Sequence, residues 1–294
     1  MKLNLTTKNL RDAGESAVVL TGFNNISKSL TASFYHVVYT PAKEPRDSFL
    51  LHCNRYFSGD FLTTLLYKVS DLIGATVLHA SKNNYDPLGA SASLLIAEAT
   101  PNSTLPRKSS DQADFTPSEL PDQVDVSRVS RQSELLHLDK SHLAAHTYPD
   151  SHLQRAHAWF RIDIDLSTCG EVNPLHALDT LLGELTPDVF TLDLRFRGFT
   201  LDQAGNYCFN DQSLVRFLPF INAAHQKLYQ VKETCLGKHR VFMFKGIRAD
   251  FTAPEYQLKA RKNMEIPSLK KPLATGSRAW TVVSQAAHKI FVLQ

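Results

Sequence analysis

A serine, a histidine and a cysteine with catalytic potential lie close together near the middle of the chain. Residues 138–150 read Leu-Asp-Lys-Ser-His-Leu-Ala-Ala-His-Thr-Tyr-Pro-Asp, with Ser141 directly after Lys140 and His146 five positions further on. Cys169 follows in a Ser-Thr-Cys-Gly motif. A hydroxyl nucleophile near a base that titrates around neutral pH can carry out acyl transfer. We therefore expect chemistry at the peptide bond between Lys140 and Ser141.

The reaction that suits this segment is self-cleavage. The Ser141 hydroxyl would attack the carbonyl of Lys140, and the amide would become an ester. A base would then remove the α-hydrogen of residue 141, for which a histidine is suited, and β-elimination followed by hydrolysis would leave a pyruvoyl group. The pyruvoyl ketone can form a Schiff base with a substrate amine and accept electrons when carbon dioxide departs. Cys169, expected between a strand and a helix N-terminus, suits the acid that returns a proton to the substrate.

These residues are part of a longer series of motifs. In them the chain resembles bacterial S-adenosylmethionine decarboxylase proenzymes, which are pyruvoyl-dependent enzymes of spermidine synthesis. The motifs occur in the family's order: Gly-Phe-Asn-Asn at 22–25, Pro-Leu-Gly-Ala-Ser at 87–91, the segment 138–150, Ser-Thr-Cys-Gly at 167–170 and Arg-Phe-Arg-Gly-Phe-Thr at 195–200.

The resemblance implies a role for each site residue. Ser141 would be the pyruvoyl precursor and Schiff-base carbonyl, with cleavage between Lys140 and Ser141. His146 would be the proton acceptor in processing, and Cys169 the proton donor in decarboxylation. Ser91 falls where some family members have a serine that assists processing.

The resemblance also implies the reaction and the partners. The enzyme would be a carbon–carbon lyase that converts S-adenosylmethionine into carbon dioxide and decarboxylated S-adenosylmethionine, the aminopropyl donor for spermidine. The cofactor would be the covalent pyruvoyl group, and processed α and β chains would associate as a homo-oligomer. Some members also need Mg²⁺, for which the sequence identifies no ligands.

Three alternatives stay open from the residues alone. One is a pyruvoyl-dependent decarboxylase of another amino acid. Another is a non-processing relative that binds and regulates a partner, although the intact Ser141, His146 and Cys169 speak against it. The last is a metal-dependent hydrolase, because several histidines cluster and two have helical ligand spacing. The clustered histidines are His137, His142, His146, His152 and His157.

Hydrophobic patterning predicts the fold class. Alternating apolar and polar residues predict half-buried strands at 158–166 and 190–196. Apolar residues at helical spacing predict a helix over 60–73 and another that starts near Pro174. Strands with one polar face, mixed with helices, favour an α+β sandwich with helices packed on one side of a largely antiparallel sheet.

Composition sets the remaining expectations. We expect a loose leader over 1–20 and a single domain over 21–294, with a flexible insertion at 99–134 that is rich in proline, serine and aspartate. The hydrophobic content of 43% and charged content of 21% are typical of a soluble globular protein. A net charge of +3 gives no reason to expect nucleic acid. No signal peptide or membrane-length apolar run is visible, so we expect a cytoplasmic protein with unpaired thiols.

Overall fold

The computed structural model describes most of the chain. The described residues are 24–40, 42–98, 141–150, 156–169, 172–201, 207–208, 216–236, 241–251, 253 and 276–293. The expected leader at 1–20 and the insertion at 99–134 lie outside these residues, as do His137 and His152.

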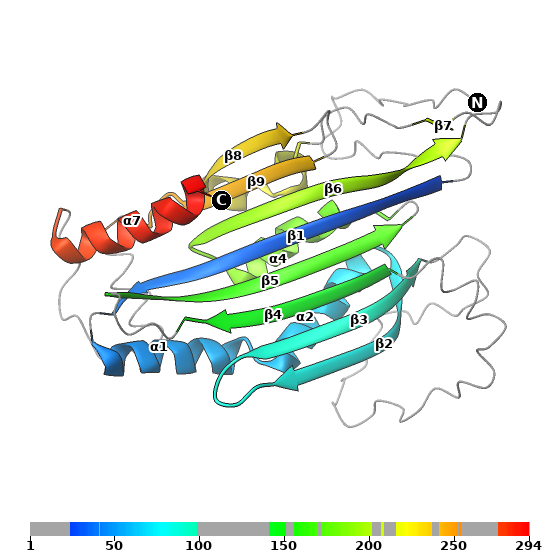
Figure 1. Ribbon diagram of the computed structural model, residues 1–294. Helices are drawn as coiled ribbons and strands as arrows, with labels where there is room; N and C mark the ends of the chain where they lie inside the picture. The colour runs from blue at the N-terminus through cyan, green and yellow to red at the C-terminus, as the bar shows by residue number, and fades with distance from the viewer. Residues whose placement is uncertain are drawn as a thin grey trace.

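One antiparallel sheet organises the described residues (Figure 1). Its main path runs β2-β3-β4-β5-β1-β6-β9-β8, and β7 pairs with β6. The strands are β1 (Asn24–Tyr39), β2 (Ala75–Asn84), β3 (Ala90–Glu98), β4 (Ser141–Pro149), β5 (His157–Cys169), β6 (Val189–Leu201), β7 (Tyr207–Cys208), β8 (Tyr229–Leu236) and β9 (Val241–Arg248). The expected α+β class is confirmed.

Helices connect the strands and cover the sheet. They are α1 (Lys43–Tyr56), α2 (Gly59–Leu72), the 3₁₀ helix η1 (Pro174–Ala177), α4 (Leu178–Leu185), the 3₁₀ helix η2 (Leu218–Phe220), α5 (Ala223–Leu228) and α7 (Arg278–Leu293). The predicted helix over 60–73 corresponds to α2, whose N-cap Ser58 accepts a hydrogen bond from the Phe61 amide. None of the described helices is long and apolar enough to cross a membrane.

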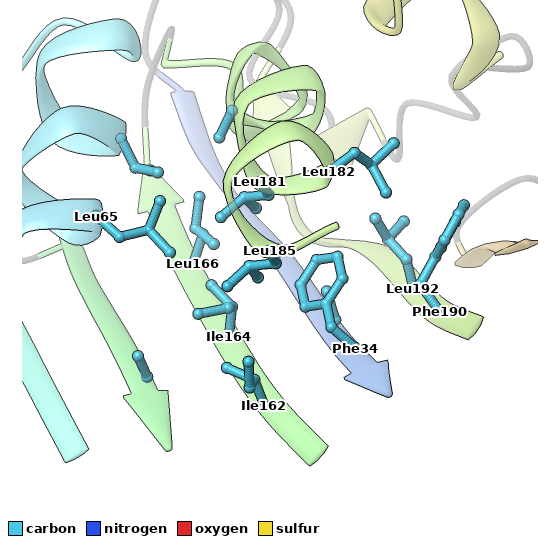
Figure 2. Close-up of a cluster of buried hydrophobic side chains, with 14 of the residues drawn as sticks. Phe34, Leu65, Ile162, Ile164, Leu166, Leu181, Leu182, Leu185, Phe190 and Leu192 are labelled. Carbon is cyan, nitrogen blue, oxygen red and sulfur yellow. The ribbon is translucent and has the colours of Figure 1, made fainter. Parts of the chain in front are cut away.

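The main core lies between the sheet and helices α1, α2 and α4. Along β5 every second residue is buried, because alternate side chains of a strand point to opposite faces. Figure 2 shows Leu181 and Leu185 of α4 close to side chains of β5 and β1, such as Ile164 and Phe34. Full burial of each such side chain contributes about 2 kcal/mol.

A second, smaller core corrects the expectation that all helices lie on one side. Helix α7 packs on the opposite face of the sheet, where Val283 and Ala287 contact the cluster of Tyr35, Val37 and Val189. Strand β1 is therefore buried on both faces at this end, and residues 34–38 are all buried. Figure 1 shows α7 at one end of the sheet only.

The rest of that face is lined by polar side chains, and we call it the open face. Most of its side chains are half-buried or exposed. The open face comprises Ser91 and Ser93 on β3, His142, Ala144 and His146 on β4, Asp163, Asp165, Ser167 and Cys169 on β5, Ser27, Ser29, Thr31 and Ser33 on β1, and Asp193, Arg195 and Arg197 on β6.

Candidate functional site

Ser141 and Cys169 are in direct contact, although 28 positions separate them in sequence. Ser141 is the first residue of β4 and is 1% exposed. Its hydroxyl oxygen accepts a hydrogen bond of 3.1 Å from the backbone N–H of Cys169. The residue expected to become the pyruvoyl group is thus held at the residue expected to act as proton donor.

Cys169 is the last residue of its strand. Strand β5 runs to Cys169 itself, three residues beyond the expected end near Leu166. A 3₁₀ helix starts at Pro174, where the Asn173 side chain caps it by accepting from the Leu175 amide. The Cys169 side chain is half-buried.

Two buried polar residues near Ser141 were not singled out from the sequence. His142 pairs with Ser167, so the register places Ser141 beside Thr168, which in turn pairs with Lys28 of β1. Thr168 is fully buried, and Lys28 is only 7% exposed. A buried lysine so close to the cleavage position is unusual. Sequence alone could not reveal it, because the neighbourhood depends on the pairing of β1 with β5.

His146 and Ser91 form a second group, on the open face. They are direct cross-strand partners of β4 and β3, so their side chains point to the same side of the sheet. The Ser91 hydroxyl lies 2.7 Å from the hydroxyl of Tyr85. Ser91 is buried, whereas His146 is half-buried.

The two groups do not meet within one chain. Ser141 and His146 are five residues apart on the same strand, which corresponds to about 16 Å along the strand. The odd separation also directs their side chains to opposite faces. Ser141 is buried with the core-facing residues of β4, whereas His146 lies on the open face.

The strand geometry also bears on the metal-hydrolase alternative. His142 and His146 lie on a β-strand, where residues four apart are about 13 Å apart and cannot share one ion. The described residues contain no group of three histidine, cysteine or acidic side chains that could hold a metal. They therefore do not fit a magnesium cage of protein ligands, and we assign no step to Mg²⁺.

Asp163 is a further charged residue beside His146. The Ser33 hydroxyl donates a 2.7 Å hydrogen bond to Asp163 Oδ1, and Arg161 Nε lies 3.2 Å from the same oxygen. Burial raises the pKa of the Asp163 carboxyl, although Ser33, Arg161 and His146 act in the opposite direction. The alternation of β5 indicated a polar face for Asp163, but its neighbours follow only from the strand register.

Comparison with known proteins identifies the family. The family model described as S-adenosylmethionine decarboxylase matches residues 51–198, which include Ser91, Ser141, His146 and Cys169. The S-adenosylmethionine decarboxylase proenzyme of Desulfitobacterium hafniense (strain DSM 10664 / DCB-2) is 34% identical over 86% of this chain and 89% of the relative.

Two further relatives with the same name are similar to comparable extents. The proenzyme of Clostridium botulinum (strain Eklund 17B / Type B) is 34% identical over 86% of this chain and 92% of its own length. That of Halorhodospira halophila (strain DSM 244 / SL1) is 34% identical over 81% of this chain and 82% of its own. The chain therefore belongs to the S-adenosylmethionine decarboxylase family.

Proposed function

We propose that this chain is a precursor that cleaves itself between Lys140 and Ser141 and then acts as a pyruvoyl-dependent S-adenosylmethionine decarboxylase. The observation that carries the proposal is the hydrogen bond from the Cys169 amide to the Ser141 hydroxyl. It connects the segment 138–150 with the Ser-Thr-Cys-Gly motif at 167–170, the two most informative motifs of the sequence. The names of the relatives, all proenzymes of this decarboxylase, support the same conclusion.

The Cys169 amide has a clear use during processing. It holds Ser141 Oγ in place while that oxygen attacks the Lys140 carbonyl. The same oxygen later becomes the ester oxygen and departs with the Lys140 carboxylate when the Cβ–Oγ bond breaks. An N–H aimed at the oxygen on which negative charge develops lowers the barrier of that step.

Decarboxylation then needs an electron sink and an acid. The pyruvoyl ketone supplies the electron sink. We assign the acid to the Cys169 thiol, which returns a proton to the substrate α-carbon after carbon dioxide has left. The Cys169 backbone contacts residue 141, and its side chain lies on the open face, from which the proposed partner copy would approach.

His146 lies out of reach of Ser141 in the same chain. In one chain the base is about 16 Å from the α-carbon that it must deprotonate, on the other face of the sheet. We therefore propose that the precursor self-associates through the open face, which carries both His146 and Cys169. Each copy then offers its His146 and Ser91 to the Ser141 of its partner.

The charge pattern of the open face fits a second copy. Asp163 and Asp165 lie on β5, whereas Arg195 and Arg197 lie on β6, and the small polar side chains of β1 separate the two strands. In a two-fold arrangement Asp165 of one copy can face Arg195 or Arg197 of the other.

The same proposal places the protein in the cytoplasm. Cys53, Cys169 and Cys235 carry thiols and form no disulfide in the described part of the chain. A reducing compartment keeps thiols in this state.

The deciding experiment is an intact mass spectrum of the purified protein under denaturing conditions. We expect two chains, one ending at Lys140 and one starting with a pyruvoyl group at position 141. Release of carbon dioxide from S-adenosylmethionine, compared with histidine, aspartate and arginine, then tests the substrate. A single uncut chain without decarboxylase activity would contradict the proposal and favour a regulatory relative.

A further inference from the structure

A row of polar side chains crosses the open face at His146. The strand register pairs Ser91 with His146, His146 with Asp163, and Asp163 with Ser33. Directly opposed residues of an antiparallel pair point to the same face, with Cβ atoms about 5 Å apart. His146 therefore lies between a serine and a carboxylate, which are the neighbours that an acid–base histidine needs.

Asp163 is fixed before any substrate binds. Its Oδ1 accepts from Ser33 and pairs with Arg161, whose guanidinium carbon lies 4.2 Å from the centre of the Tyr148 ring. Asp165 is the other carboxylate on this part of β5, but it pairs with Ala144 rather than with His146. Asp163 is thus held in place, and it is the carboxylate of β5 that faces the imidazole.

We propose that Asp163 is the positioning residue for the His146 imidazole. It accepts a hydrogen bond from one ring nitrogen, so the other ring nitrogen is the unprotonated base. The inference rests on the proposed function, which makes His146 the base of the processing step. No hydrogen bond joins the two side chains among the described contacts, and rotation about the histidine side-chain bonds is sufficient to form it at this Cβ separation.

The step that Asp163 supports is the elimination that opens the ester. The α-proton of residue 141 in the partner chain moves to the free nitrogen of His146. The electron pair of that C–H bond forms the Cα=Cβ double bond, the Cβ–Oγ bond breaks, and the Lys140 carboxylate leaves. His146 becomes an imidazolium, which the adjacent Asp163 carboxylate stabilises.

The pKa of Asp163 is consistent with this role. Burial raises the pKa of the carboxyl, and nearby Asp165 adds to the effect, whereas Ser33, Arg161 and His146 lower it. A carboxylate that burial has partly desolvated interacts more strongly with a neighbouring imidazolium than a fully solvated one does.

The test follows processing of the full-length precursor over time in wild type, Asp163→Asn, His146→Ala and the control Asp71→Asn, which removes an exposed carboxylate from α2 on the other side of the sheet. Hydroxylamine cleaves the ester but not the peptide, so it reveals the intermediate, and intact mass distinguishes serine from pyruvoyl at position 141. We expect Asp163→Asn to accumulate the ester and to form pyruvoyl 10- to 100-fold more slowly, on the order expected for a perturbed general base. Asp71→Asn should process at the wild-type rate.

Two further variants make the test specific. The double variant Asp163→Asn/His146→Ala should be no slower than His146→Ala alone, because both changes disable one base. Ser33→Ala removes one hydrogen bond to Asp163 without altering its charge and should slow the same step less.

The outcomes separate this inference from the proposed function. If Asp163→Asn forms pyruvoyl at the wild-type rate while His146→Ala stalls at the ester, the positioning role of Asp163 is wrong and the proposed function stands. Asp163→Asn that stays uncut without any ester would also overturn the positioning role, because the first acyl shift does not need the base. A wild-type chain that forms neither ester nor pyruvoyl would overturn the proposed function, and the inference with it.

Discussion

At the scale of single residues, Cys169 has two proposed roles that depend on different atoms. The Cys169 backbone N–H holds the Ser141 oxygen, whereas the proposed proton donor is the thiol. A side-chain substitution changes the second role and leaves the first intact. Sequence motifs could indicate both residues but not the backbone hydrogen bond that links them.

Cys169→Ala should therefore leave self-cleavage intact and reduce decarboxylation. The alanine variant keeps the amide that donates to Ser141, so two chains should form at the wild-type rate. Turnover should fall by a factor on the order of 10² to 10⁴, as is common when a general acid is removed. Intact mass and release of carbon dioxide from S-adenosylmethionine measure the two effects separately. Wild-type turnover in the cleaved variant would remove the thiol from the mechanism.

A second residue-scale effect concerns pH and stability. His36 of β1 is 6% exposed and stacks on Phe57, with ring centres 5.1 Å apart. Burial lowers the pKa of His36 from 6.5 to about 4, although a hydrogen bond to the Leu185 backbone opposes the shift. Between these values the unfolded chain binds a proton that the folded chain excludes, so stability falls as the pH falls from 6.5 to about 4.

His36→Phe should remove this part of the pH dependence while keeping the ring stack. In a Ser141→Ala background, which keeps the chain uncut, His36 should contribute about 3 kcal/mol to the loss of unfolding free energy across this range. Urea unfolding at pH 7, 5 and 4 measures it as the difference between the two proteins. If the unfolding free energy depends on pH in the same way in both proteins, His36 is not a neutral buried imidazole.

At the scale of elements, sequence patterns predicted β5, α2 and the antiparallel sheet. Such patterns predict an element correctly when it buries one face only, because the spacing of its apolar residues then follows the period of the helix or strand. Helix α1 was not predicted, since its buried side chains include Arg46 and do not form a long apolar stripe. Helix α7 was also missed, and its place on the second face of β1 depends on contacts between distant segments.

The packing of β9 against β6 includes one close contact that no periodicity reveals. Gly246 pairs with Phe190, and a Cβ at Gly246 would lie 2.2 Å from Phe190 Cε1. The Phe190 ring is fully buried, with the rings of Tyr229 and Phe244 beside it, so it has no free space to move into.

Gly246→Ala should destabilise the fold by about 1–3 kcal/mol through overpacking. Urea unfolding in the uncut Ser141→Ala background measures the change. The matched control is Gly246→Ala/Phe190→Leu, in which the smaller side chain makes room for the added methyl group. The double variant should cost less than the sum of its single variants, and simple additivity would show that the two residues do not collide.

At the scale of the whole molecule, the proposed site residues form two groups that lie about 16 Å apart along β4. Ser141 and Cys169 lie at the end of β4 and β5, whereas His146, Ser91 and Asp163 lie further along the open face. The sequence analysis proposed Ser141, His146, Cys169 and Ser91 but could not foresee this division. Five residues span about 8 Å along a helix and about 16 Å along a strand, so the separation depends on the secondary structure.

Because Ser141 and His146 lie far apart in one chain, complementation between two variants tests whether they act across two copies. A Ser141→Ala chain keeps its own His146 but has nothing to cleave, and a His146→Ala chain keeps Ser141 but lacks the base. If the base acts across two copies, mixed assemblies of the two co-expressed variants should convert the His146→Ala chain to pyruvoyl, although neither variant alone does so. A mass tag on the His146→Ala chain identifies which chain has been cut. Asp163→Asn in the Ser141→Ala chain should slow the rescue 10- to 100-fold, whereas Asp163→Asn in the His146→Ala chain should leave its rate unchanged. A His146→Ala chain that stays uncut in verified mixed assemblies would mean that each chain supplies its own base, and β4 would then have to leave the sheet before cleavage.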